Sequence, residues 1–187
     1  MTRPVTVNAS HRLLVPVACL LMAACAVRPG LNTPEGAATE VAQRSASAEV
    51  AAINREKAII SYRDFLARYP DGSEHDNIVR RLADLLVEQA ADLQVAAATG
   101  QGNPVQQQAQ AMQYYGEAIT HYEYLLNKYP HGPDTTEMLY QLSRASAESG
   151  ESQRALTAID RMQQAPETNI RLYADTRFRR GELMFSE

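Results

Sequence analysis

One stretch of the chain occurs twice, with identical spacing between its alanine, apolar, tyrosine, proline and glycine residues. The first copy contains Ala58, Ile59, Tyr62, Phe65, Leu66, Tyr69, Pro70 and Gly72, and the second contains Ala118, Ile119, Tyr122, Leu125, Leu126, Tyr129, Pro130 and Gly132. A third, weaker copy consists of Ala155, Ile159, Met162 and Pro166. Apolar residues at i, i+4 and i+7 followed by a proline indicate one face of a helix that ends at a fixed place. The repeat therefore predicts a series of similar helices.

A second helical pattern follows each of these helices, and in its third copy arginines occupy places that are normally apolar. It consists of Val79, Leu82, Ala83 and Leu86, then Leu139, Leu142, Ser143 and Ser146, then Arg177, Arg180, Gly181 and Met184. The chain has no tryptophan and only 3 phenylalanines, while 45% of its residues are hydrophobic, which favours helices packed through small side chains. The two alternating patterns together resemble the tetratricopeptide-repeat signature over roughly residues 50–187. The resemblance implies an all-α fold in which antiparallel helix hairpins stack as a right-handed solenoid.

The N-terminal residues 1–24 have the layout of a secretory signal peptide. Arg3 and Arg12 precede the apolar run 13–24, which contains no acidic residue and is too short to span a bilayer stably. The sequence Met22-Ala23-Ala24-Cys25 resembles the bacterial lipobox, in which the cysteine is lipidated and becomes the mature N-terminus. We therefore expect an exported lipoprotein that reaches the membrane through a lipid on Cys25.

Two further features bear on this anchor. Ordinary cleavage after Ala26 also fits the sequence and would leave a soluble periplasmic protein. In the lipoprotein resemblance, a residue other than aspartate at position 26 implies sorting to the outer membrane, and the Tyr-Pro-x-Gly ending is similar to periplasmic outer-membrane-assembly and cell-envelope coordinating lipoproteins. The other cysteine, Cys19, lies inside the expected signal, so no disulfide is expected in the mature chain.

The remaining chain divides into a flexible tether, residues 25–46, and a helical repeat domain, residues 47–187. The tether is expected because prolines and glycines occur at 29, 30, 34 and 36 and no apolar periodicity holds there. Within the domain, Leu142 and Ala155 lie 13 positions apart, whereas the equivalent Leu82 and Ala118 lie 36 apart. An insertion at this turn predicts one long hairpin, about residues 76–128, with its tip at residues 99–104.

The sequence leaves the role of the long hairpin and of the last helix open. In the hairpin, Leu86, Ala90, Leu93 and Ala97 are expected to face Val105, Ala109 and Met112, either to widen the core or to form an arm that docks a partner. Residues 174–187 match the first helix of a further repeat and keep Phe178, Leu183, Met184 and Phe185 apolar. We expect this edge to be covered by a continuation of the chain, which is then an N-terminal piece of a longer array, or by self-association with another molecule.

The motifs of catalytic and cofactor sites are missing from the sequence, and no enzyme activity or cofactor is expected. The chain has no Gly-rich phosphate loop, no nucleophile elbow and no histidine pair at metal-ligand spacing. The run Glu74-His75-Asp76 is interpreted as a helix-capping cluster and not as a metal site. The chain has 18 basic and 22 acidic residues, and without Arg3 and Arg12 its net charge is about −6, which makes nucleic acid an unsuitable partner.

The resemblance implies instead a groove lined by the first helix of each tetratricopeptide hairpin. In this chain these are the helices of the second pattern, which follow the prolines. The residues between the core positions of these helices are the expected partner-binding residues: Asn77, Arg80, Arg81 and Asp84, then Tyr140, Gln141 and Arg144, then Phe178, Arg179 and Glu182. Because arginines make bidentate contacts with carboxylates, we expect a peptide or helix with acidic residues as ligand. The expected function is a scaffold or adaptor for other cell-envelope proteins or peptides, facing the periplasm from the outer membrane. The alternative is a soluble periplasmic accessory or sensor module.

Overall fold

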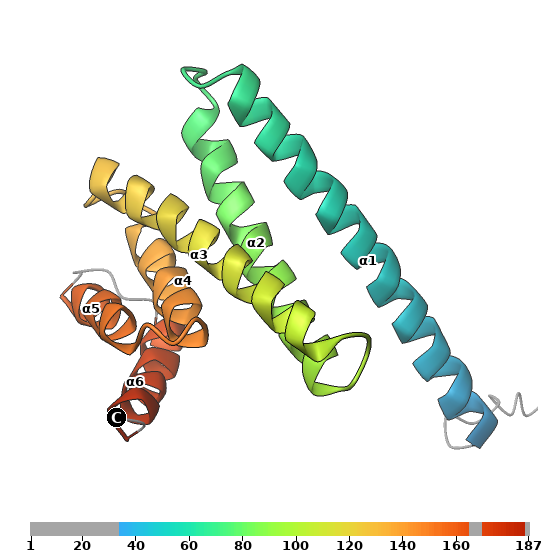
Figure 1. Cartoon of the computed structure of the whole chain (residues 1–187). Coiled ribbons are helices and arrows are strands. Elements are labelled where there is room, and N and C mark those ends of the chain that lie inside the picture. Colours follow the sequence, from blue (N-terminus) through green and yellow to red (C-terminus); the bar gives the residue numbers. More distant parts are fainter. Residues whose placement is uncertain (1–33, 165–169, 186–187) are drawn as a thin grey trace, which may run out of the picture. The chain divides into compact units, whose positions relative to one another are not determined.

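The computed structural model describes residues 34–164 and 170–185, and in these ranges all regular structure is helical (Figure 1). The prediction of an all-α fold is confirmed. The six helices of this part of the chain are α1 (Pro34–Arg68), α2 (His75–Ala98), α3 (Pro104–Lys128), α4 (Thr135–Glu148), α5 (Ser152–Gln163) and α6 (Ile170–Phe185). Helices end where the sequence predicts, near Pro70, at the tip 99–104 and near Pro130, and another ends just before Gly150, while Pro166 lies outside the described residues.

The repeated sequence forms the same turn twice. In the turn between α1 and α2, Tyr69 N donates to Phe65 O at 2.9 Å, Gly72 N donates to Tyr69 O at 3.3 Å, and His75 N donates to Gly72 O at 3.0 Å. The turn between α3 and α4 makes the same three bonds 60 positions later, at 2.7, 3.4 and 3.1 Å. A Cβ atom at position 72 would lie 3.4 Å from Tyr69 O, so glycine keeps the turn tight. The sequence repeat is thus a repeat of backbone structure.

The two hairpin tips also share one backbone pattern. Each tip places a glycine in the left-handed region, Gly100 with φ 72° and Gly150 with φ 81°, where side chains other than glycine are strained. The N–H of the following residue donates back to the helix in both, from Gln101 to Ala96 O and from Glu151 to Ser146 O. These bonds satisfy carbonyl groups that a helix end leaves unpaired.

The hairpins α2–α3 and α4–α5 differ mainly in length. The helices of the first have 24 and 25 residues, and those of the second have 14 and 12. The ten extra residues of α2 correspond to about 15 Å of helix. At the tip of the long hairpin, the Asn103 side chain accepts hydrogen bonds from the backbone of Val105 and Gln106, and Pro104 takes the first helical position. The insertion is therefore regular helix with its own end signals.

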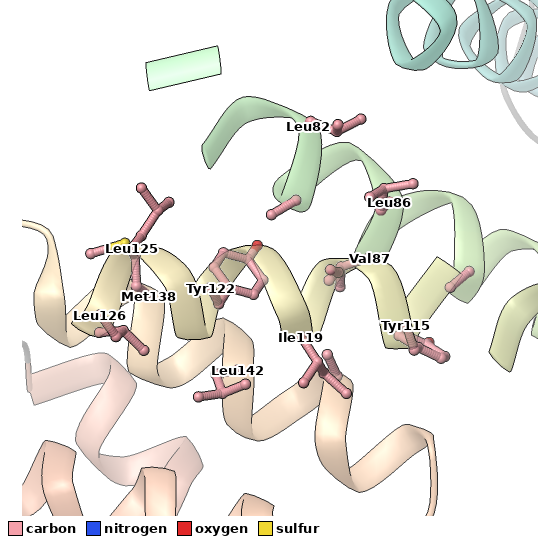
Figure 2. Close-up of a cluster of buried hydrophobic side chains, with 14 of the residues drawn as sticks. Leu82, Leu86, Val87, Tyr115, Ile119, Tyr122, Leu125, Leu126, Met138 and Leu142 are labelled. Carbon is pink, nitrogen blue, oxygen red and sulfur yellow. The ribbon is translucent and has the colours of Figure 1, made fainter. Parts of the chain in front are cut away.

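The core is built where α2, α3 and α4 meet (Figure 2). Its residues recur every three or four positions, as expected for helix faces: Leu82, Leu86 and Val87 of α2, Tyr115, Ile119, Tyr122, Leu125 and Leu126 of α3, and Met138 and Leu142 of α4. The small residues Ala83, Ala118, Ser143 and Ala155 are fully buried, so neighbouring helices approach closely there. A smaller cluster of Ala155, Ile159 and Leu183 joins α5 to α6.

Three local expectations, in α1, α3 and α6, differ from the structure. Residues 34–46, assigned above to the tether, belong to α1, because Pro34 suits a helix start and the alanine- and glutamate-rich segment after it needs no apolar stripe to be helical. In α3, Val105 is 78% exposed and Ala109 is exposed, since the buried stripe runs through Ala111 and Tyr115 instead.

In α6, the buried residues are Thr176 and Leu183, while Arg177 and Met184 are exposed. The packed face thus lies one residue earlier than the sequence pattern places it. Arg180 is half-buried because it reaches back to an ion pair with Asp160 of α5. Phe178, Met184 and Phe185 are exposed, as expected for an edge of the repeat domain.

Candidate functional site

Four of the expected binding residues line one cavity of about 370 Å³. Arg80 and Asp84 reach it from α2, where they lie one turn apart, and Gln141 and Arg144 reach it from α4. The cavity is also lined by Arg55, Val87, Glu88, Ala91, Asp92 and Glu137. The first helices of the two hairpins therefore form the walls of a groove, which we call the α2/α4 groove.

A second cavity, of about 570 Å³, adjoins this groove through two shared residues, Arg80 and Asp84. It contains the other two expected residues of α2, Asn77 and Arg81, together with Tyr62, Glu74 and Ile78. Asn77 Nδ2 donates to Glu74 Oε2 at 2.9 Å, whereas Arg81 is exposed and forms no ion pair with the acidic side chains of the described residues. All four expected residues of α2 thus lie along one connected surface.

The three expected residues of α6 line neither cavity. Phe178 and Glu182 are exposed, and Arg179 forms an ion pair with Glu148 of α4 at 3.7 Å. The structure therefore does not bring these residues together with those of α2 and α4. The expected Tyr140 contributes indirectly, since its hydroxyl donates to Asp175 Oδ2 of α6 at 2.9 Å and holds α4 against α6.

The charge of the α2/α4 groove differs from the arginine-rich surface expected from the sequence. Arg80 is ion-paired with Asp134, and Arg55 of α1 is ion-paired with both Glu88 and Asp92. The groove lining contains four acidic residues, Asp84, Glu88, Asp92 and Glu137, beside three arginines. Sequence reasoning missed Glu137, although its i, i+4, i+7 spacing with Gln141 and Arg144 places all three on one face of α4.

Asp84 connects the floor of the groove to the core. The Tyr122 hydroxyl donates to Asp84 Oδ1 at 2.6 Å, and Tyr122 is itself fully buried. Burial raises the pKa of the Asp84 carboxyl, against the opposing effects of Tyr122, Arg80 and Arg81. The hydrogen bond fixes the carboxyl at the bottom of the groove and satisfies a tyrosine hydroxyl that burial would otherwise leave unpaired.

Arg144 is the groove arginine that keeps its binding capacity. Its Nη1 donates to Gln141 Oε1 at 3.2 Å, and its guanidinium lies 5.9 Å from the ring centroid of Tyr140. No acidic side chain of residues 34–164 or 170–185 forms an ion pair with it. Both contacts orient the guanidinium without neutralising it, so a carboxylate from another molecule has donors available.

A second polar cluster joins the two ends of the long hairpin at its base. Asp76 accepts hydrogen bonds from Lys128 Nζ at 2.7 Å, Tyr124 at 3.1 Å and His75 at 3.2 Å, and also from Tyr129. Burial acts to raise the pKa of Asp76, but these four bonds outweigh it and hold the pKa well below its usual range.

This cluster corrects the helix-capping interpretation of residues 74–76. Glu74 takes the N-cap position of α2 without a side-chain capping bond, because its carboxylate accepts from Asn77 instead. Asp76 turns to α3, four hydrogen bonds already occupy its carboxylate, and the cluster is best explained as a structural clamp.

Among the described residues, no group of three or more His, Cys, Asp or Glu side chains is placed to hold a metal ion. No helix in this part of the chain is both long and apolar enough to cross a bilayer. The expected signal peptide and Cys25 lie outside the described residues. No protein-family model, curated protein or solved structure matches the chain.

Proposed function

We propose that the protein is a scaffold or adaptor that holds a segment of another cell-envelope protein in the α2/α4 groove and catalyses no reaction. One observation carries the proposal: Arg80 and Asp84 of one hairpin and Gln141 and Arg144 of the next line a single cavity of about 370 Å³. A groove between successive helix hairpins is the position where the tetratricopeptide resemblance expects a ligand.

The repeated structure supports the same proposal. The turns before α2 and α4 share their backbone hydrogen bonds, so the two helices enter their hairpins in the same way. A series of such hairpins with a regular rotation between them builds a right-handed solenoid with a continuous concave surface. In this arrangement the groove is one part of a longer surface that includes the adjoining cavity at Asn77 and Arg81.

A photo-crosslinking amino acid tests the groove in cells. Placed at Gln141, which lines the groove, it is expected to capture a defined set of envelope proteins. Placed at Gln110, an exposed position on α3 that lines none of the cavities described here, it is expected to capture few or none of them. Equal capture from both positions would refute a groove-specific role.

We further propose that a lipid on Cys25 anchors the protein to the outer membrane, so that the repeat domain faces the periplasm. The lipobox-like Met22-Ala23-Ala24-Cys25 and the alanine at position 26 support this placement. A labelled fatty acid should be incorporated into the native chain and not into Cys25→Ala, and the label should fractionate with the outer membrane. A native chain without label would refute the anchor and favour a soluble periplasmic protein.

A further inference from the structure

Two charged side chains of α4, Glu137 and Arg144, line the α2/α4 groove without an oppositely charged partner in the described part of the chain. Both are half-buried, and the Glu137 side chain makes no hydrogen bond there either. The other two arginines of the groove, Arg55 and Arg80, are neutralised by ion pairs. A half-buried charge has lost part of its hydration, so an unpaired one gains the most from a charged ligand.

The positive member of this pair is held in place before any ligand arrives. Tyr140 is fixed by its hydrogen bond to Asp175, and the Arg144 guanidinium lies over the Tyr140 ring. Gln141 accepts one N–H of the guanidinium at 3.2 Å and leaves its other donors available. Less side-chain freedom is then lost on binding, which favours affinity.

The spacing of the two charges restricts the ligand. Positions 137 and 144 are seven residues apart on α4, which places their Cα atoms about 10 Å apart along the helix axis. In an extended polyproline-type chain, residues i and i+3 lie on one side about 9 Å apart, which is close to this spacing.

We propose that the groove selects extended segments that carry an acidic residue and a lysine or arginine three positions apart. The carboxylate binds Arg144, where a guanidinium provides paired donors, and the cation binds Glu137. A segment with two acidic residues at this spacing is disfavoured, because one of them meets Glu137. This inference rests on the proposed function and replaces the simpler expectation of an acidic peptide.

Amide chemical shifts of the full chain in detergent micelles, titrated with short peptides, test the charge rule. The probe acetyl-Gly-Asp-Pro-Pro-Lys-Gly-amide is expected to shift the amides of residues 137–144. Replacing its charged residues with Asn and Gln, or its Lys with Asp, should weaken binding about tenfold, the equivalent of about 1.4 kcal/mol.

Protein variants provide the matched controls. Arg144→Gln and Glu137→Gln should each weaken binding of the Asp/Lys peptide about tenfold, and Glu137→Lys should reverse the preference in favour of the Asp/Asp peptide. Arg154→Gln, which removes an arginine of α5 that pairs with Glu123 and Glu151 and does not line the groove, should leave the affinity unchanged.

Two results would overturn the charge rule: equal affinity for the charged and neutral peptides, or no shifts within residues 137–144. If either occurs while Gln141 still crosslinks envelope proteins, the charge rule fails and the groove function stands. If Gln141 captures nothing beyond the Gln110 background, the proposed function itself fails.

Discussion

The long hairpin α2–α3 and the short hairpin α4–α5 begin and end in the same way but differ in length. Both follow a Tyr-Pro-x-Gly turn, and both reverse direction at a glycine with positive φ. The extra residues of the long hairpin lie between the shared core positions and the tip, where Ala90 and Ala111 extend the buried face. The comparison shows that the base of a hairpin and its length are specified by separate parts of the sequence.

The bases of the two hairpins differ in one polar feature. Asp76 clamps the start of α2 to the end of α3, and the position 60 residues later, in the short hairpin, is Thr136. The short hairpin thus has no carboxylate at the position of Asp76. If these features are independent, the length, the tips and the Asp76 clamp should each contribute separately to the free energy of unfolding.

Tyr115→Ala should have the largest effect, because it removes a buried aromatic side chain where the extension of the long hairpin begins. Tyr115 is 1% exposed, and its hydroxyl donates to Gln94 Oε1 at 2.8 Å. We expect a loss of about 3 to 5 kcal/mol in the free energy of unfolding, measured by urea denaturation. Val105→Ala, on the exposed face of the same helix, should change it by less than about 0.5 kcal/mol. A small effect would show that Tyr115 and its hydrogen bond to Gln94 contribute little to the long hairpin.

Alanine at the two tip glycines should cost similar amounts in both hairpins. Gly100 and Gly150 have positive φ, and no neighbouring atom lies within 4 Å of a Cβ added at either position. The cost is therefore backbone strain alone, about 1 to 2 kcal/mol for each variant. Thermal unfolding followed by circular dichroism measures both. Costs that differ clearly between the tips would contradict their structural equivalence.

Asp76→Asn should cost about 1 kcal/mol at neutral pH, since the clamp is partly exposed and solvent weakens its ion pair. The pKa of Asp76 is lowered in the folded chain, so its contribution is present above the unfolded value of about 3.9 and is lost as the pH falls through the lower folded value. The difference between the native chain and the variant should therefore shrink below about pH 4.

The exposed Asp71, in the turn before α2, provides the control for this effect. Asp71→Asn should show no comparable difference at neutral pH. If the native chain and Asp76→Asn remain separated by the same free energy down to pH 2, a carboxylate clamp is not the cause.

Gly116→Ala should have the smallest effect, and it should be stabilising. Gly116 lies within α3, and no neighbouring atom is within 4 Å of an added Cβ. Alanine is favoured over glycine inside a helix by about 0.5 to 1 kcal/mol. Destabilisation would mean that another surface approaches the long hairpin closely at this position.

The sequence predicts those parts of the fold that local signals determine. The turns at Pro70 and Pro130 and the tips at Gly100 and Gly150 follow from backbone conformations that few residues adopt. The helix faces of α2 and α4 follow from the 3.6-residue period, which also brings Arg80, Asp84, Gln141 and Arg144 to one groove.

The sequence does not predict features that depend on neighbouring helices. Arg55 enters the groove from α1, and nothing in its local sequence indicates the ion pairs that neutralise it. The packed face of α6 lies one residue from the expected one, because its apolar residues, such as the adjacent Leu183, Met184 and Phe185, do not mark a single face. Residues 34–46 have helix-forming residues but no apolar stripe, so their sequence resembles a tether although they belong to α1.

The central claim is that the α2/α4 groove, and not the outer surface of the hairpins, holds the partner. The most direct test is the yield of crosslinks from Gln141 in cells that carry Arg144→Glu, compared with cells that carry Arg154→Glu. Both substitutions reverse one arginine, but only Arg144 lines the groove, while Arg154 lies on α5 in an ion pair with Glu123. We predict that Arg144→Glu lowers the yield about tenfold or more and that Arg154→Glu leaves it unchanged. Equal yields in the two variants would contradict the claim.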